Sequence, residues 1–140
     1  MNTSLLAMHD AAALLPLDPQ PSSQIVALAA ETAHEGVRAY ARTLGEVPAP
    51  AWAALLLEEQ SQVVLAACGP TLGVSPELQH QRWVAARVRD GWSPGEVLDR
   101  ARKAHPNLCP WALLPESQRA KARLFVELVR GTCTALAPRG

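Results

Sequence analysis

GWSPGEVLDRARKAHPNLCPWALLPESQR, residues 91–119, holds two tryptophans, four prolines and a histidine in a chain otherwise rich in alanine and leucine. Pro106 and Pro110 exclude a continuous helix through this stretch, because proline lacks the N–H donor and its ring fixes φ. The stretch is therefore a long connection with helices expected on both sides. Its stiff, bulky residues predict one fixed path rather than a variable loop.

Apolar spacing and capping residues place the helices around this connection. Upstream we expect one helix from Ile25 to Leu44, stopped by Gly45, and a second over 52–67, ended by Cys68-Gly69-Pro70. Ser75-Pro76-Glu77 is a strong start for a third helix, which ends at Gly91. The last helix begins at Pro115. Its expected apolar stripe is Leu124, Phe125, Leu128 and Val129. Inside the connection, Ser93 to Glu96 reads as a capping box and predicts a short helix to about Ala104.

The two halves of the chain are similar in sequence. His34 precedes Gly45 by the same spacing as His80 precedes Gly91, and we place both histidines on the first turns of their helices. A Pro/Trp-rich connection follows each glycine. When the residues after the two connections are aligned, Leu56 matches Leu114, Glu58 matches Glu116 and Gln60 matches Gln118. The pattern predicts two pseudo-repeated helix–loop–helix units, about 25–68 and 75–137, with the longer connection in the second. Chance similarity in an Ala/Leu-rich chain is the alternative.

Length and composition predict one small all-α domain over residues 23–140, after an N-terminal apolar segment and linker over 1–22. Thirteen basic and thirteen acidic residues cancel, so the net positive field of a non-specific nucleic-acid binder is missing. We expect no nucleic-acid partner. No run is long and apolar enough for a membrane span, and no basic residue precedes the apolar start as in a secretory signal. We expect a cytoplasmic protein, with no membrane partner and three reduced cysteines that bind no metal.

One part of the sequence resembles the RyR domain, the ryanodine receptor repeat. It is the motif HQRWVAARVRDGW together with the residues spaced after it, D, K-HP-L-PW and LLPE. The resemblance extends over about residues 25–130. It rests on His80, Trp83, Gly91, Trp92, Gly95, Asp99, Lys103, His105, Pro106, Leu108, Pro110, Leu114 and Pro115. The family usually has Lys where Arg87 stands, and Tyr where Pro94 and Trp111 stand. The resemblance implies a helical, non-catalytic domain of the small stand-alone type found in bacteria and bacteriophages. It also implies recognition of a nucleotide-derived signal.

No sequence motif predicts catalysis. The chain has no Gly-rich phosphate loop, no H-E-x-x-H and no G-x-S-x-G. We therefore expect no enzymatic activity and no cofactor. An enzyme acting on a nucleotide, with His80 or His105 as base, is the reading with least support.

The aromatic and basic residues of the second half are the candidate ligand contacts. Trp92 and Trp111 flank the connection, and stacking on a planar ligand is the functional alternative to plain packing. Basic side chains, together with free N–H groups at a helix start on Ser93, suit a phosphate. Asp99 and Lys103 would pair on the short helix. The predicted ligand-binding residues are Trp92, Trp111, His105, Arg87, Lys103, Asp99, His80 and Trp83.

Two functions of different classes follow. The leading hypothesis is a binding protein for a nucleotide-derived small molecule, which in a phage would sequester a host immune signal. The alternative is a protein-interaction or assembly module without a small ligand. In that case the apolar residues 5–17 would cover a neighbouring subunit and make a homo-oligomer.

Overall fold

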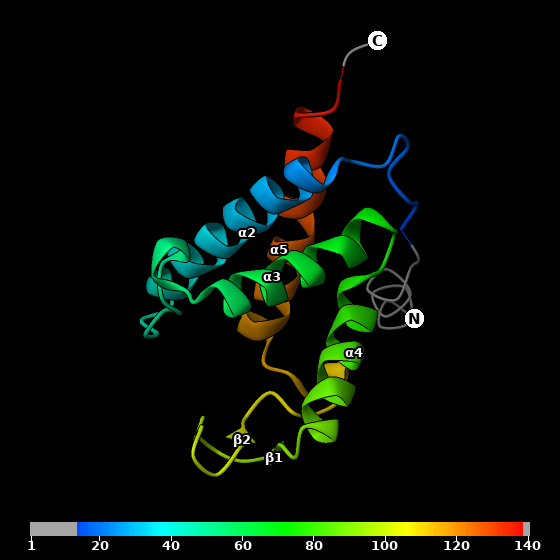
Figure 1. The fold of residues 1–140 in the computed structure, drawn as a ribbon. Coiled ribbons are helices and arrows are strands. Elements are labelled where there is room, and N and C mark those ends of the chain that lie inside the picture. Colours follow the sequence, from blue (N-terminus) through cyan, green and yellow to red (C-terminus); the bar gives the residue numbers. More distant parts are fainter. Residues whose placement is uncertain (1–13, 139–140) are drawn as a thin grey trace.

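The computed structural model describes residues 14–138, so most of the apolar segment 5–17 lies outside the described range. The described chain is all-α, as expected. Its helices are α2 (Ser23–Thr43), α3 (Leu57–Thr71), α4 (Pro76–Arg89) and α5 (Glu116–Ala135). The 3₁₀ helices η1 (Trp52–Ala54) and η2 (Trp111–Leu113) precede α3 and α5, and the strands are β1 (Ser93–Pro94) and β2 (Ala104–His105). Helices α2, α3 and α5 pack together, and α4 leads from the end of α3 towards the small sheet (Figure 1).

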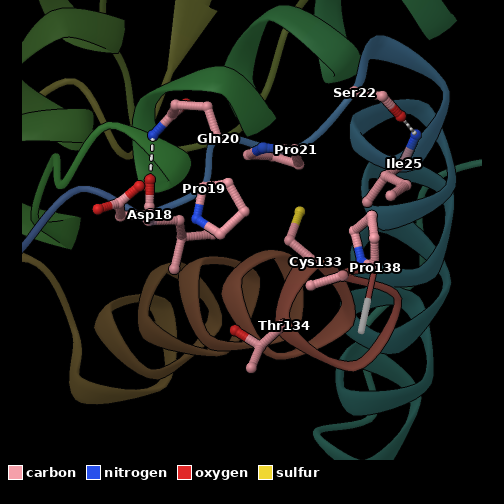
Figure 2. A pocket seen from close by; sticks show the side chains of 11 residues that line it. Asp18, Pro19, Gln20, Pro21, Ser22, Ile25, Cys133, Thr134 and Pro138 are labelled. Atoms are coloured by element: carbon pink, nitrogen blue, oxygen red, sulfur yellow. Dashed lines mark hydrogen bonds between the residues drawn. The ribbon is translucent and has the colours of Figure 1, made fainter. Parts of the chain in front are cut away.

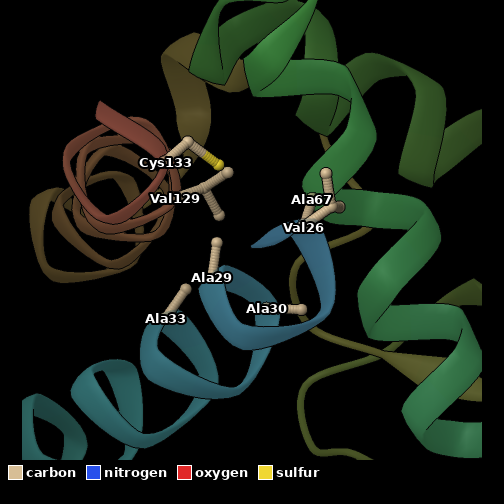
Figure 3. Packing of buried hydrophobic residues seen from close by; sticks show 7 residues of the cluster. All are labelled: Val26, Ala29, Ala30, Ala33, Ala67, Val129 and Cys133. Carbon is tan, nitrogen blue, oxygen red and sulfur yellow. The ribbon is translucent and has the colours of Figure 1, made fainter. Parts of the chain in front are cut away.

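Small side chains allow α2 and α5 to lie close together, and the core forms where they meet α3 (Figure 3). Ala29 and Ala33 of α2 are fully buried facing Val129 of α5, and Ala30 is fully buried on the neighbouring side of α2 (Figure 3). At Gly36, one turn further along α2, an added Cβ would overlap Leu128 Cδ1. Close packing at this contact therefore depends on alanine at the buried positions of α2, and a residue larger than glycine at position 36 would require the Leu128 side chain to move.

Helix α3 is longer at its C-terminal end than expected. It continues through Gly69 and Pro70 to Thr71, although we expected these residues to end it at Ala67. Pro70 cannot donate to the carbonyl of Ala66, one turn earlier, and the side-chain Nε2 of Gln79 on α4 donates to that carbonyl instead, at 2.5 Å. The proline is tolerated because a side chain from the next helix replaces the missing donor.

The prediction of a short helix from Ser93 to about Ala104 is wrong. Ser93 and Pro94 form β1, which pairs in parallel with Ala104 and His105 of β2. The Ser93 N–H donates to Lys103 O at 2.8 Å, and a Cβ on Gly95 would lie only 2.7 Å from Ala104 Cβ. The segment has no apolar stripe to bury as a helix, and Gly95 instead allows close approach of the two strands.

The two halves share a common design. Ser22 and Ser75 cap α2 and α4, each accepting the N–H three residues later. Gly45 and Gly91 follow these helices with φ of +74° and +89°, a conformation that suits glycine.

Each connection then ends in a 3₁₀ turn that begins with tryptophan. Trp52 and Trp111 occupy equivalent positions, and Leu56 and Pro115 cap α3 and α5 in the same extended conformation.

Two details of the expected repeat are corrected. Equivalent residues after the connections are 59 positions apart, as Trp52 and Trp111 show, whereas the expected match of Leu56 with Leu114 is one residue out of register. His34 lies in the middle of α2 rather than on its first turn. The reason is that α2 has more residues before His34 than α4 has before His80.

The linker before α2 runs against the end of α3. Leu17 N donates to Thr71 O at 2.9 Å, and the side-chain Nε2 of Gln20 donates to the same carbonyl, also at 2.9 Å. These bonds hold the linker in a defined path beside the core. None of the helices in residues 14–138 is long and apolar enough to cross a membrane.

Burial predicts that truncation of two valines changes the free energy of unfolding by clearly different amounts. Val129 is 0% exposed, and Val129→Ala should lower the free energy of unfolding by about 2 kcal/mol, because two methyl groups leave a void between α2 and α5. Val47 is 96% exposed, and Val47→Ala should change the free energy of unfolding by less than about 0.5 kcal/mol. Urea denaturation of the two variants measures both values. Equal losses would contradict the packing described here.

Candidate functional site

Five aromatic side chains gather between α4, the connection after it and η2. We call this group the aromatic cluster: His80, Trp83, Trp92, His105 and Trp111. The ring contacts run in a chain. Trp111 lies 5.9 Å from His80 between ring centroids, His80 lies 5.8 Å from Trp83, Trp83 lies 4.9 Å from His105, and His105 lies 6.3 Å from Trp92. Such distances are those of packed rings, so the connection is fixed to α4 by aromatic contacts.

His80 fastens the end of the connection. Its Nε2 lies 2.8 Å from the carbonyl oxygen of Cys109. Since a carbonyl only accepts, Nε2 carries the proton and donates. The first half repeats this bond, with His34 Nε2 at 2.8 Å from Pro50 O and its ring 5.8 Å from that of Trp52. In both halves a histidine of the first helix is thus bonded to a carbonyl of the connection that follows.

His105 lies between Trp83 and Trp92 in the cluster and is a neutral ring. Its Nδ1 accepts the backbone N–H of Asn107 at 3.0 Å, so Nε2 carries the proton. Burial lowers the pKa of His105 below its usual 6.5, and the charges of Arg100 and Arg87 lower this pKa further.

A polar chain connects the cluster to the first half of the molecule. The side-chain amide of Asn107 donates to Gln118 Oε1 at 3.1 Å, and Gln118 Nε2 donates to Glu46 Oε1 at 3.0 Å. Lys121 also pairs with Glu46. Gln118 is available for this role because Pro115 has no N–H for it to cap, whereas in the first half Glu59 caps the N–H of Leu56.

Two donors at the cluster have no acceptor among the described residues. The indole Nε1 of Trp111 is buried without a hydrogen bond, and so is Nε of Arg87. The other end of the Arg87 guanidinium reaches Asp90, with Nη2 at 3.2 Å from Oδ2. A buried N–H without a partner costs about 1–3 kcal/mol, so an acceptor brought by a ligand would be favourable here.

The structure separates the predicted site residues into two groups. His80, Trp83, Trp92, His105 and Trp111 form the cluster, and Arg87 borders it, since its backbone carbonyl accepts the N–H of Trp92 at 3.0 Å. Trp111 is only 6% exposed and forms the floor of the cluster, whereas the other four rings are partly exposed.

Lys103 and Asp99 lie outside the cluster and do not pair, because no helix joins them. Lys103 Nζ donates to the carbonyl of Asp90 at the end of α4, at 2.7 Å, where a cation suits the helix dipole. Asp99 Oδ1 accepts the N–H of Arg102 at 3.1 Å and closes a turn. The free N–H groups expected at Ser93 are also missing, since Ser93 donates to Lys103.

Sequence reasoning missed the residues behind the cluster. Asn107, Gln118 and Glu46 have no motif of their own, and they come together only through the packing of α5. Within residues 14–138, no three His, Cys, Asp or Glu side chains gather as a metal site. The arrangement offers partly exposed rings, buried donors and a guanidinium, which together suit the binding of a planar acceptor or anion.

The lowered pKa of His105 predicts a pH effect on stability. The unfolded chain binds the proton more readily than the folded one, so the contribution of His105 is fully present above pH 6.5 and is lost as pH falls through the lower folded pKa. His105→Asn keeps an oxygen to accept the Asn107 N–H but cannot titrate. Urea unfolding at pH 7.5 and pH 5 should show a larger loss in the wild type than in this variant. Parallel losses would contradict a His105 ring that stays neutral in the folded chain.

A family model for the RyR domain matches residues 73–136, which include α4, the connection, η2 and α5. The whole aromatic cluster lies inside this range. No curated protein matches the chain. Residues 73–136 of this chain are therefore similar to the RyR domain.

Proposed function

We propose that this RyR-like domain is a non-catalytic binding module that recognises a nucleotide-derived small molecule at the aromatic cluster. The observation that carries the proposal is the pair of buried donors, Trp111 Nε1 and Arg87 Nε, beside partly exposed rings. Ligand acceptors would satisfy both donors, and each ring–base stack contributes about 1–3 kcal/mol. A protein that binds such a signal without converting it sequesters the signal.

The charges at the cluster favour an anionic ligand over a neutral one. Arg87 and Arg100 both act on His105, whose own ring stays uncharged. Among the described residues, Asp90 alone supplies a carboxylate that pairs with Arg87. A phosphate could take the unpaired edge of this guanidinium while the base stacks on Trp92 or Trp83.

Calorimetric titration with AMP, cyclic AMP, cyclic GMP and cyclic dinucleotides tests the proposal. At least one should bind, and Trp92→Ala or Arg87→Gln should weaken its binding by about tenfold or more, the loss of one stack or one charge-assisted bond. Arg89→Gln is the matched control, because Arg89 is exposed on the same turn of α4 and should leave the affinity unchanged.

Two results would contradict the proposal. One is no binding by any of these nucleotides, and the other is equal affinity in wild type, Trp92→Ala and Arg87→Gln. Mass analysis of the recovered nucleotide separates binding from catalysis, and an altered ligand would favour the enzymatic reading.

A docking role is the second candidate, because apolar side chains are exposed on and after the connection. Val97 is 74% exposed and Leu113 is 72% exposed. If these residues join copies of the chain, light scattering should give a mass above the 15.0 kDa of one chain. The double variant Val97→Ser, Leu113→Ser should return it to one chain. A single-chain mass for the wild type would contradict this alternative.

A further inference from the structure

A cavity lies at the other end of α5 from the aromatic cluster (Figure 2). Its volume is about 360 Å³, and its walls are the linker before α2 and the last turns of α5. Gln118, behind the cluster, and Cys133, at the cavity, are separated by about 22 Å along the helix axis. The cavity is thus independent of the site proposed above. It has the size of a small-ligand pocket, for which roughly 300–1,000 Å³ is usual.

The outer wall of the cavity is a strap fixed at both ends. At one end the linker is bonded to Thr71 O through Leu17 N, at 2.9 Å. At the other end Ser22 caps α2, accepting the N–H of Ile25 at 3.3 Å. Pro19 and Pro21 between these ends stiffen the strap. The cavity is therefore formed before any ligand arrives, which reduces the ordering that binding requires.

Within residues 14–138, the lining is mostly apolar and contains no cationic side chain. The apolar lining residues are Leu17, Pro19, Pro21, Ile25, Ala137 and Pro138. Asp18 is the single charged residue among the described residues of the lining, so these residues offer a phosphate or carboxylate no counter-charge. An anionic nucleotide does not fit this chemistry, and an uncharged apolar molecule does.

The floor of the cavity carries an unpartnered polar group. Cys133 is 3% exposed, its thiol points into the cavity in Figure 2, and it has no hydrogen bond among the described residues. Burial raises the pKa of this thiol, so it keeps its proton and acts as a weak donor. A ligand with one acceptor or a polarisable ring would be a partner for this thiol.

We propose that the cavity between the linker and the end of α5 binds a small, uncharged, mostly aromatic or aliphatic molecule, with the Cys133 thiol against it. Indole is a suitable probe, because it is planar and uncharged and has the apolar surface that these walls would bury. Its binding should not depend on the aromatic cluster.

Cysteine alkylation of the full chain tests this site. N-ethylmaleimide labelling, read separately on Cys68, Cys109 and Cys133 by peptide mass mapping, should slow only at Cys133 when indole is added. At about ten times the Kd of indole, the slowing should be about tenfold, because the unbound fraction falls in that proportion. Equal protection of all three cysteines, or none, would overturn the proposal.

Two alanines at the end of α5 give matched variants, Ala135 as its last residue and Ala137 just after its cap. Ala137 lines the cavity, whereas Ala135 is exposed and does not line it. Ala137→Trp should abolish indole binding and the protection of Cys133, and Ala135→Trp and Trp92→Ala should leave both unchanged. Indole binding retained in Ala137→Trp would contradict the assignment.

A second measurement on the wild type keeps the test valid if Ala137→Trp does not fold. Amide chemical shifts should move on indole addition at residues of the linker and of the end of α5. Shifts confined to residues 80–111 would place the probe at the aromatic cluster and overturn the proposal.

Discussion

The hydrogen bond from the His80 ring to the carbonyl of Cys109 is the constraint on which the second half of the molecule depends. It ties the far end of a long connection to α4, and it does so just before Trp111 turns the chain into η2. The same bond, from His34 to Pro50 O, closes the shorter connection of the first half. In both halves the tied tryptophan packs against the histidine that holds the connection, so one side chain fixes both the path of the backbone and the position of a large ring.

The differences between the halves account for the site. The first connection is short, and its tryptophan packs against the core of α2, α3 and α5. The second connection adds β1, β2 and His105, which bring Trp83 and Trp92 into one group with Trp111. Pro115 at the start of α5 leaves Gln118 free to bind Asn107 and Glu46, so the added segment is also bonded to the first half. The longer second connection thus adds a partly exposed aromatic cluster to the helix–connection–helix arrangement that both halves share.

Local signals in the sequence predicted the main elements of the fold. Ser75-Pro76 and Gly91 mark the limits of α4. The RyR resemblance was expected over about residues 25–130, and the family model matches its second part, residues 73–136. The signals failed where tertiary contacts decide the outcome. Gln79 allows α3 to continue through Pro70, and the S-x-x-E pattern at Ser93 is overridden because its N–H pairs with Lys103. The cavity beside Cys133 has no sequence signature, since the linker and the end of α5 meet only in the folded chain.

The ring nitrogens of the histidines test this account most directly. Carbonyls accept the bonds of His34 and His80, and an N–H occupies Nδ1 of His105, so all three rings should carry their proton on Nε2 at neutral pH. Long-range ¹H–¹⁵N correlation of the imidazole rings distinguishes the two tautomers. We expect the Nε2–H form at residues 34, 80 and 105. A dominant Nδ1–H form at His80 would contradict the account, because that ring could not then hold the connection to α4.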